Sequence, residues 1–241
     1  MIKIGILPTT KLYEDDNPYN DIYTFNNVYI KKIYESGAIP IGILLNDGIL
    51  DYNTLDMCDG FLIGGGKKIE PYYLEVIDYA IKNNKPLLGI CLGMQSIGVY
   101  SYIETLLKED NLSLTKDNFI SKFSKIKEEK INFLKPVEGH YNIKITREEY
   151  LPNKHKVDVI KDSKLYNIYK KDTINVLSMH NYAVNLIGND VLINCKYDDV
   201  IEGIEYKDKN LFILGVQWHP EIEKENNILF ETLIKEAEKR I

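Results

Sequence analysis

Cysteine is scarce in this sequence: the 241 residues include three, widely spaced and without a C-x-x-C pair. So few cysteines disfavour a disulfide framework and a zinc knuckle, and they fit a reducing compartment. The sequence also has no apolar run long enough to span a bilayer, and its short apolar N-terminus lacks the features of a signal peptide. We therefore expect a cytoplasmic protein that has no membrane partner.

Two phosphate-binding signatures are missing as well, namely the Walker A loop and the G-x-G-x-x-G fingerprint. A formal net charge of −6 argues against a nucleic-acid partner, because binding to phosphate backbones needs a basic surface. Apolar residues make up 44% and charged residues 27% of the chain, which is ordinary for a soluble protein with a substantial core. No linker-like segment divides the chain, so we expect a single domain over residues 1–241.

Short apolar runs alternate with helical patterns in the first hundred residues. Strands are predicted at residues 2–7, 38–45, 57–63 and 86–90, with a polar surface loop at 9–20 and helices around 22–33 and 74–81. Strands that alternate with helices are typical of a parallel sheet with right-handed crossovers. The chain is therefore predicted to be of the α/β class.

The pattern changes after residue 137 and becomes rich in strands. Strand candidates lie at residues 140–146, 157–160, 174–177, 191–195, 200–206 and 211–216, and an amphipathic helix follows at 229–241. The last strands are expected to rejoin the central sheet. Residues 101–135 are rich in Lys and Glu, and we predict exposed helices without a functional role there, because such charge usually faces solvent.

The residues around Cys91 form the pattern G-x-C-x-G, in which Gly89 and Gly93 flank the cysteine. An apolar strand precedes the pattern, and residues 94–99 continue it with helical periodicity. This is the nucleophile-elbow arrangement with Cys in place of Ser, and a helix N-terminus favours the thiolate. A structural cysteine between two glycines would explain neither the strand nor the helix. We predict that Cys91 is a displayed nucleophile on a strained turn.

A run of three glycines, Gly64, Gly65 and Gly66, follows the predicted strand at 57–63. Glycines leave backbone N–H groups unobstructed, and acyl transfer needs two converging N–H donors for the oxyanion. We predict an oxyanion hole formed by Gly65, Gly66 and the N–H of Leu92, the residue after the nucleophile. A plain tight turn and a phosphate loop are the weaker alternatives.

His219 and Glu221 follow the strand candidate at 211–216 in the stretch Q-W-H-P-E. Two residues apart in an extended chain, they would face the same side. His219 could then take the proton of Cys91 while Glu221 orients the ring, which is the logic of a catalytic triad. A packing histidine and a helix-capping glutamate would not explain the pairing with an elbow. A zinc site at Cys91 and His219 lacks further ligands at suitable spacing, so we expect neither metal nor cofactor.

The other histidines and cysteines carry weaker signals. His180 follows a strand, at the sheet edge where α/β proteins bind ligands, and we predict a substrate-binding residue there, with plain packing as the alternative. His140 lies at a strand start, and His155, in a Lys-rich turn, is expected to be solvated. Cys58 and Cys195 lie in apolar strands and are expected in the core.

The segments G-I-C-L-G-M-Q and G-V-Q-W-H-P-E resemble the two signatures of class I glutamine amidotransferase domains. The opening I-K-I-G-I-L-P, the turn D-G-F-L-I-G-G-G and the stretch S-M-H-N-Y are more similar to the γ-glutamyl-γ-aminobutyrate hydrolase branch, the peptidase C26 family. The resemblance covers nearly the whole chain and thins between residues 101 and 135. It implies a flavodoxin-like three-layer α/β/α sandwich with a mainly parallel central sheet.

The resemblance also implies an activity, the cleavage of a γ-glutamyl amide through a γ-glutamyl thioester with release of glutamate and an amine. Cys91 matches the nucleophile, His219 the base and Glu221 its orienting carboxylate. Gln95 matches a residue that contacts the glutamyl part of the substrate in the glutaminase relatives. The implied partner is a small γ-glutamyl compound, and the resemblance leaves a homodimer open.

Several positions depart from the hydrolase branch. Leu92 stands where that branch usually has Arg, Lys67 stands where it has an acidic residue, and Asn181 and Tyr182 replace the end of its S-x-H-H-Q motif. These departures leave the amine half of the substrate open. One alternative is a glutaminase subunit that delivers ammonia to a synthase, although the β-rich region at 137–206 could enclose a pocket of its own. A second, a non-catalytic sensor of γ-glutamyl ligands, is disfavoured by the intact catalytic residues.

Overall fold

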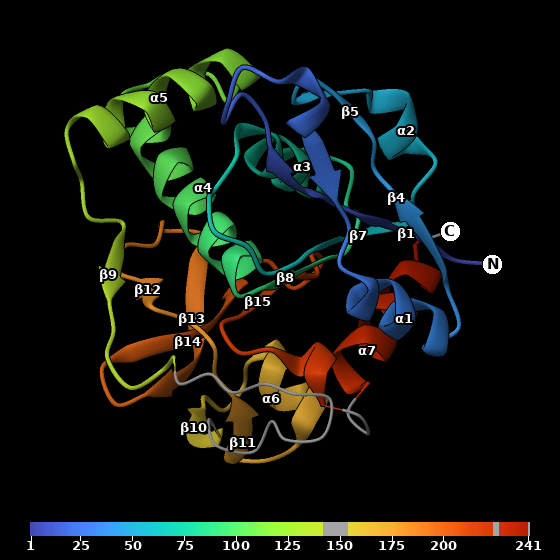
Figure 1. The fold of residues 1–241 in the computed structure, drawn as a ribbon. Coiled ribbons are helices and arrows are strands. Elements are labelled where there is room, and N and C mark those ends of the chain that lie inside the picture. Colours follow the sequence, from blue (N-terminus) through green and yellow to red (C-terminus); the bar gives the residue numbers. More distant parts are fainter. Residues whose placement is uncertain (142–153, 224–226, 241) are drawn as a thin grey trace.

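The structure is a computed structural model that describes residues 1–141, 154–223 and 227–240 (Figure 1). Its strands are β1 (Lys3–Ile6), β2 (Thr9–Lys11), β3 (Ile22–Thr24), β4 (Ile39–Gly42), β5 (Leu45–Asn46), β6 (Ile49–Leu50), β7 (Gly60–Ile63), β8 (Leu87–Ile90), β9 (Leu134–Pro136), β10 (Lys154–Val159), β11 (Thr173–Leu177), β12 (Tyr182–Val184), β13 (Val191–Tyr197), β14 (Val200–Tyr206) and β15 (Ile213–Val216). Its helices are α1 (Asn27–Glu35), α2 (Tyr52–Asp56), α3 (Pro71–Lys82), α4 (Leu92–Glu109), α5 (Lys116–Glu128), α6 (Lys164–Tyr169) and α7 (Ile228–Glu238), with 3-10 turns η1 (Pro18–Asn20) and η3 (Pro220–Ile222).

One large sheet organises these elements, in the order β11-β10-β13-β14-β15-β8-β7-β1-β4. The strands from β15 to β4 pair in parallel, and those from β14 to β11 extend the sheet in antiparallel pairs. The parallel strands are nearly continuous apolar runs, as expected for strands that helices cover on both faces. The predicted α/β fold with a mainly parallel central sheet, and the return of the last strand to that sheet, are confirmed.

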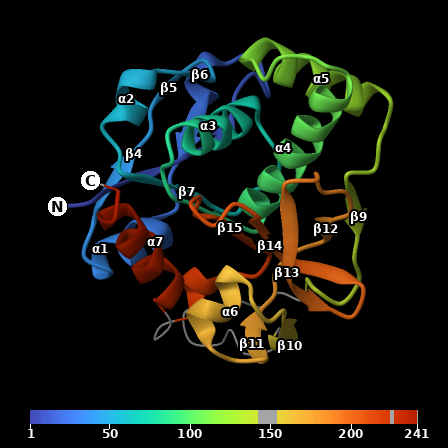
Figure 2. The same cartoon turned by 180° about the vertical axis from the view of Figure 1, so that it is seen from behind.

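Helices cover both faces of the sheet and close a separate apolar core on each (Figures 1 and 2). The first core lies under α3, α4 and α5, and the second lies under α1, α6 and α7. The carboxyl ends of the parallel strands all lie at one edge of this sheet, where α/β folds carry their functional loops. No helix within the described ranges is both long and apolar enough to cross a membrane.

Several predicted boundaries were wrong near the N-terminus. The predicted loop at residues 9–20 contains β2, which pairs with β3, so Ile22 lies in a strand and not in a helix. Helix α1 begins only after Asn26, whose side chain accepts the N–H of Val28 at 3.2 Å. An N-cap of this kind sets the start of a helix more strongly than apolar spacing does. The strand predicted from residue 57 starts at Gly60, because α2 runs to Asp56 and Met57 is its C-cap.

The segment at 101–135 was predicted to be exposed, and this was wrong for one face of α5. Phe119, Phe123 and Ile126 are buried there, and the ring of Phe119 stacks on Tyr100 of α4. Their spacing of four and three residues is that of an apolar helix face, which the surrounding lysines obscured. The predicted strand at 140–146 lies mostly outside the described residues, as does residue 241 at the end of the predicted last helix.

A close approach of α4 to β7 determines where the strand-to-helix turn can sit. A Cβ atom at Gly93 would lie 2.1 Å from the carbonyl oxygen of Ile63, a contact with rigid backbone. At Gly98, on the same helix, a Cβ atom would meet only side-chain methyl groups, those of Val184 at 3.0 and 3.2 Å and that of Ile204 at 3.7 Å. Glycine is therefore required at the first position far more than at the second.

We predict that Gly93→Ala destabilises the fold by more than about 3 kcal/mol, because β7 and α4 would have to separate. Gly98→Ala is the matched control, since it gains helix propensity and needs only a small side-chain shift. Urea unfolding followed by circular dichroism compares the two. Equal midpoints for both variants and the parent protein would contradict this account of the turn.

Candidate active site

The strand-to-helix turn at Cys91 has the predicted strained backbone. Cys91 has φ of 52° and ψ of −102°, a combination that non-glycine residues rarely adopt, and α4 begins at the next residue. Its N–H donates to the carbonyl of Val216 at 2.8 Å, which joins the turn to β15. The residue is less displayed than predicted, with 7% of its surface exposed, yet it lines a cavity. An elbow of this shape directs the thiol outward from the sheet edge.

His219 and Glu221 come together at the same edge. The Nδ1 atom of His219 lies 2.6 Å from Oε1 of Glu221, and both side chains are buried. The sequence suggested an extended chain at this point. Glu221 lies instead in the 3-10 turn η3. The N–H of His219 donates to the carbonyl of Leu177 at 3.0 Å, which fixes the backbone below the ring. The predicted pairing of the imidazole with a carboxylate is therefore present in the structure.

The charges around His219 favour its protonated form. Burial alone would lower the pKa of His219, but Glu221 and the hydrogen bond with Cys91 outweigh burial and hold that pKa well above the ordinary value near 6.5. A raised pKa of this cause favours an imidazolium beside a thiolate, the reactive form of a catalytic cysteine. Cys58, in contrast, is buried in the core, where burial raises its pKa to about 11. Cys195 is also buried, so both core predictions are confirmed.

Tyr29, which lies within the range predicted as a helix at 22–33, also belongs to this group, although no motif in the sequence indicated a role for it. Its hydroxyl donates to Oε1 of Glu221 at 2.9 Å and accepts the N–H of Gly65 at 2.8 Å. Burial raises the pKa of Tyr29 well above its usual range, with Glu221 adding to the effect, so the hydroxyl keeps its proton and remains a donor. Tyr29 thereby connects the glycine turn to the carboxylate that orients His219.

The glycine turn lies beside the nucleophile, but its N–H groups are not equivalent. The N–H of Gly65 is already bonded to Tyr29, so it is not directed at a substrate in this conformation. Gly66 lines the cavity together with Cys91 and Leu92. Leu92 is the first residue of α4, where backbone N–H groups have no partner within the helix. The proposed oxyanion hole therefore depends on Gly66 and Leu92, with Gly65 as a support.

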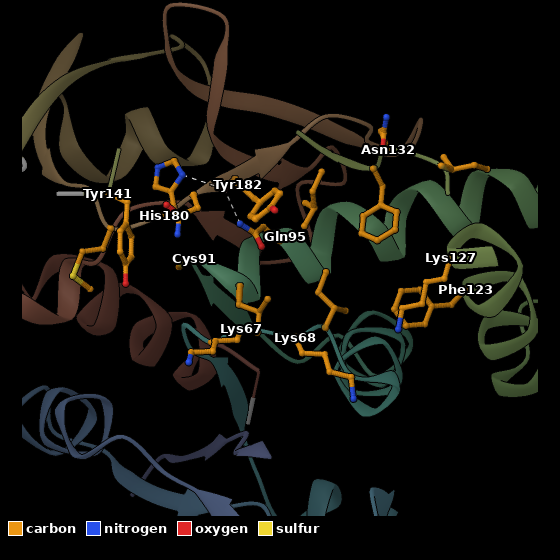
Figure 3. Close-up of a pocket in the computed structure, with 18 residues that line it drawn as sticks. Lys67, Lys68, Cys91, Gln95, Phe123, Lys127, Asn132, Tyr141, His180 and Tyr182 are labelled. Atoms are coloured by element: carbon orange, nitrogen blue, oxygen red, sulfur yellow. Dashed lines mark hydrogen bonds between the residues drawn. The ribbon is translucent and has the colours of Figure 1, made fainter. Parts of the chain in front are cut away.

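A cavity of about 600 Å³ opens above Cys91 (Figure 3). Its walls combine the glycine turn and its lysines, the start of α4, the end of α5 with the segment after it, and the segment before β12. The lining residues are Gly66, Lys67, Lys68, Ile69, Cys91, Leu92, Gln95, Phe123, Lys127, Ile131, Asn132, Phe133, Leu134, Tyr141, Met179, His180, Asn181 and Tyr182. The segment at 101–135, which was predicted to have no role, thus supplies part of the wall through Phe123 and Lys127.

The two predicted substrate contacts, Gln95 and His180, both line this cavity and are held by the same carbonyl. The side-chain amide of Gln95 donates to the carbonyl of Tyr182 at 2.9 Å, and Nδ1 of His180 lies 3.1 Å from the same oxygen (Figure 3). The second ring nitrogen of His180 lies 3.2 Å from Nδ1 of His140. Because its Nδ1 contacts the carbonyl of Tyr182 and its Nε2 faces the buried side chains of His140 and Glu202, His180 would shape the pocket more than bond to a substrate.

The prediction that His155 is solvated was wrong. It lies on β10, largely buried, with its ring 4.8 Å from that of His140 and 4.6 Å from that of Tyr197. Its lysine neighbours at 154 and 156 alternate with it along the strand, and their side chains are exposed. The sequence signal for this was the alternation of side chains along a strand. The lysines at 154 and 156 had instead indicated a basic turn.

The fold and this arrangement define a class, the class I glutamine amidotransferase-like proteins. The glutaminase domain of the CTP synthase of Trypanosoma brucei, solved with bound acivicin, superimposes with a TM-score of 0.66 at 18% identity, over 99% of this chain and 94% of that one. The sequence profile of the peptidase C26 family matches residues 72–221, which is more than half of the chain. The chain therefore belongs to the peptidase C26 family.

Two curated relatives show how far the similarity extends. A glutamine amidotransferase-like protein of Rickettsia prowazekii is 29% identical over 96% of this chain and 96% of its own length. The γ-glutamyl-CDP-amidate hydrolase of Campylobacter jejuni is 28% identical over 70% of this chain and 58% of its own length. Together with the family, these relatives identify a hydrolase of the glutamine amidotransferase-like type.

We predict that Tyr29→Phe lowers kcat by about 10- to 100-fold, because a buried carboxylate and a buried N–H each lose a partner. Tyr34→Phe, at an exposed position of the same helix, is the matched control and should retain full activity. His219 should keep its raised pKa in Tyr29→Phe, since Glu221 remains. Steady-state kinetics and the ¹⁵N chemical shifts of His219 against pH report the two effects separately, and unchanged kinetics would exclude this role of Tyr29.

We also predict that Glu221→Gln lowers the pKa of His219 toward about 6.5, because it removes the negative charge that raises it. Because the pKa of His219 is higher in the folded than in the unfolded protein, its protonation stabilises the fold at pH values below the unfolded-state pKa. This stabilisation is lost as the pH rises through the folded-state pKa. The variant should therefore lose its imidazolium at lower pH than the parent protein. In a serine triad an amide at the matching position costs about 10⁴ in rate, and we expect less with a thiol.

His219→Ala should reduce kcat more than Glu221→Gln, since it removes the proton carrier itself. An NMR titration of the histidine nitrogens and a pH profile of kcat/KM measure the two substitutions. Equal losses of kcat, or an unchanged pKa of His219 in Glu221→Gln, would show that these roles are assigned wrongly.

Proposed function

We propose that this protein is a cysteine-dependent hydrolase that cleaves a γ-glutamyl amide. The thiolate of Cys91 attacks the γ-carbonyl carbon, and the resulting oxyanion faces the N–H groups of Gly66 and Leu92. The imidazolium of His219 donates its proton to the leaving amine, the C–N bond breaks, and a γ-glutamyl thioester remains. A water molecule then gives its proton to His219 and attacks the thioester, which releases glutamate and restores the thiolate.

The observation that carries this proposal is the position of Cys91 on a strained elbow in the wall of a large cavity, with the His219–Glu221 pair beside it. The similarity to a γ-glutamyl-CDP-amidate hydrolase supports a hydrolytic outcome. The cavity is closed on several sides by this chain's own segments, which supports turnover without a partner protein. The three cysteines are all unpaired, as expected for the proposed cytoplasmic location.

The charge at the cavity suggests the chemistry of the amine half. Lys67, Lys68 and Lys127 all contribute to its lining, and Figure 3 shows Lys67 and Lys68 across the cavity from His180. Lys68 pairs with Glu70 at 2.9 Å, and Lys127 lies over the ring of Phe123. Such a surface favours an anionic leaving group, one that carries a carboxylate or a phosphate. We therefore propose substrates in which the amine half is negatively charged.

A glutaminase subunit is the second candidate, and the similarity to a CTP synthase glutaminase domain favours it. Leu92 and Gln95 match glutaminases as well, whereas the lysines would have no role with ammonia as the leaving group. A non-catalytic sensor of γ-glutamyl ligands is the third candidate. The hydrogen-bonded His219–Glu221 pair beside Cys91 argues against it, because a sensor has no use for a proton carrier.

The test is to measure glutamate release by the purified chain alone from γ-glutamyl-γ-aminobutyrate, γ-glutamyl-ethylamide, a phosphorylated γ-glutamyl amide and glutamine. We expect kcat/KM for the anionic amides to exceed that for γ-glutamyl-ethylamide by about tenfold or more, and Lys67→Gln to reduce this ratio. Acid quenching followed by intact-protein mass spectrometry should find a glutamyl adduct on the parent protein. Cys91→Ala should give no adduct and no turnover.

Each other outcome selects another candidate. Activity on glutamine alone, or activity only after a synthase is added, would establish the glutaminase. Tight binding of a γ-glutamyl ligand with no turnover of any substrate would establish the sensor. Full activity of Cys91→Ala without an adduct on the parent protein would overturn the mechanism itself.

A further inference from the structure

Three of the four histidines converge on one carboxylate, that of Glu202. Its Oε1 lies 3.2 Å from Nδ1 of His140, 3.3 Å from Nε2 of His180 and 3.5 Å from Nε2 of His155. These residues come from four separate parts of the chain: β10, β14, the loop before β12 and the segment after β9.

Glu202 is fully buried, yet neither of its carboxylate oxygens makes a well-formed hydrogen bond in the described part of the structure. The Nε2 atom of His155 is buried without a hydrogen bond as well. The short distances to the rings therefore do not come with N–H vectors aimed at the carboxylate. A buried carboxylate in this position is costly unless a cation satisfies it.

We infer that this cluster is a binding site for a divalent transition-metal ion, with His140, His155 and Glu202 as ligands. Their donor atoms all lie within 4.8 Å of one another. Bonds of about 2.0–2.1 Å in a tetrahedral site place neighbouring ligand atoms about 3.3 Å apart, close to the separations from Glu202 found here. Two or three imidazoles with one carboxylate suit zinc and its neighbours in the first transition row, and they suit neither calcium nor magnesium.

His180 is placed to act as a fourth ligand. Its Nδ1 lies 3.1 Å from the carbonyl of Tyr182, which accepts a proton from that nitrogen and leaves a lone pair on Nε2. Nε2 faces Glu202 and His140, at 3.3 and 3.2 Å. Histidine ligands of metals usually donate their other N–H to such a carbonyl, which fixes the tautomer and the ring orientation. The protein thus supplies an orienting contact beyond the ligands themselves.

The rival explanation is a metal-free cluster in which one imidazolium neutralises Glu202. Burial would raise the pKa of Glu202, but the histidines outweigh burial and hold it far below its usual range, which either explanation accommodates. Geometry distinguishes them, because an imidazolium would direct its N–H along the short contact to the carboxylate. The donor atoms of His140, His155 and Glu202 instead lie within 4.8 Å of one another, and neither oxygen of Glu202 has a hydrogen bond within the described residues.

An ion here would connect the antiparallel extension of the sheet to the pocket. It would join β10 and β14 to the loop that carries Met179, His180 and Asn181 in the cavity wall. The ion would act on the shape of the pocket, not on the reaction, because the nucleophile and its base use other residues. This inference does not depend on the proposed function.

The test uses full-length protein without a histidine tag, equilibrated with one equivalent of Zn²⁺ and dialysed, and metal content is measured by mass spectrometry. We expect about one zinc per chain in the parent protein, and a loss of at least tenfold in occupancy in His155→Gln and Glu202→Gln. His219→Ala, which removes the one histidine outside the cluster, and Cys91→Ser should keep the metal. The two controls separate this site from binding at the catalytic thiol.

Two further measurements keep the test decisive if Glu202→Gln does not fold. Chelation of the parent protein should lower its Tm, and Zn²⁺ should restore it, with no such shift in His155→Gln. Co²⁺ should give visible absorption typical of nitrogen and oxygen ligands, and this absorption should persist in Cys91→Ser. No retained metal and no shift in Tm, equal occupancy in His155→Gln, or loss of metal in Cys91→Ser would each overturn the inference.

Discussion

The parallel pairing of β8 with β15 is the interaction on which the active site depends. Backbone bonds match Gly89 with Gly215 and Ile90 with Val216, and the N–H of Cys91 extends this ladder by bonding to Val216. The nucleophile and the strand that leads to His219 therefore end at the same level of the sheet. Because neighbouring parallel strands leave the sheet at one edge, residues 128 positions apart in the chain, 219 minus 91, can share a proton.

Tyr29 adds a third element to that edge. Its hydroxyl group bonds both to the glycine turn, at the N–H of Gly65, and to the carboxylate of Glu221. No other side chain within the described residues links the two by hydrogen bonds. A tyrosine that keeps its proton donates in one direction and accepts in the other, so it fixes the glycine turn and Glu221 relative to each other. This constraint explains why an otherwise apolar helix face ends in a polar group beside the site.

The parts of the site that are local in sequence could be predicted, and the parts that depend on tertiary contacts could not. The elbow at Cys91 and the His219–Glu221 pair lie in short segments whose residue types and spacing indicate their chemistry. Tyr29 and Glu221 are 192 residues apart, and the spacing of Tyr29 on its helix is equally that of a core residue. Likewise the fold class followed from alternating strands and helices, whereas the start of α1 depended on one capping side chain, Asn26.

The four histidines show how two buried carboxylates can serve opposite purposes. Glu221 is hydrogen-bonded to Tyr29 and His219. Its charge therefore stabilises one imidazolium, which can pass a proton to and from Cys91. Glu202 faces three imidazoles, and neither of its oxygens has a hydrogen bond within the described residues, so a cation at this point would stabilise its charge further. The two carboxylates are thus suited to different cations, a moving proton at the nucleophile and a fixed ion beneath the pocket wall.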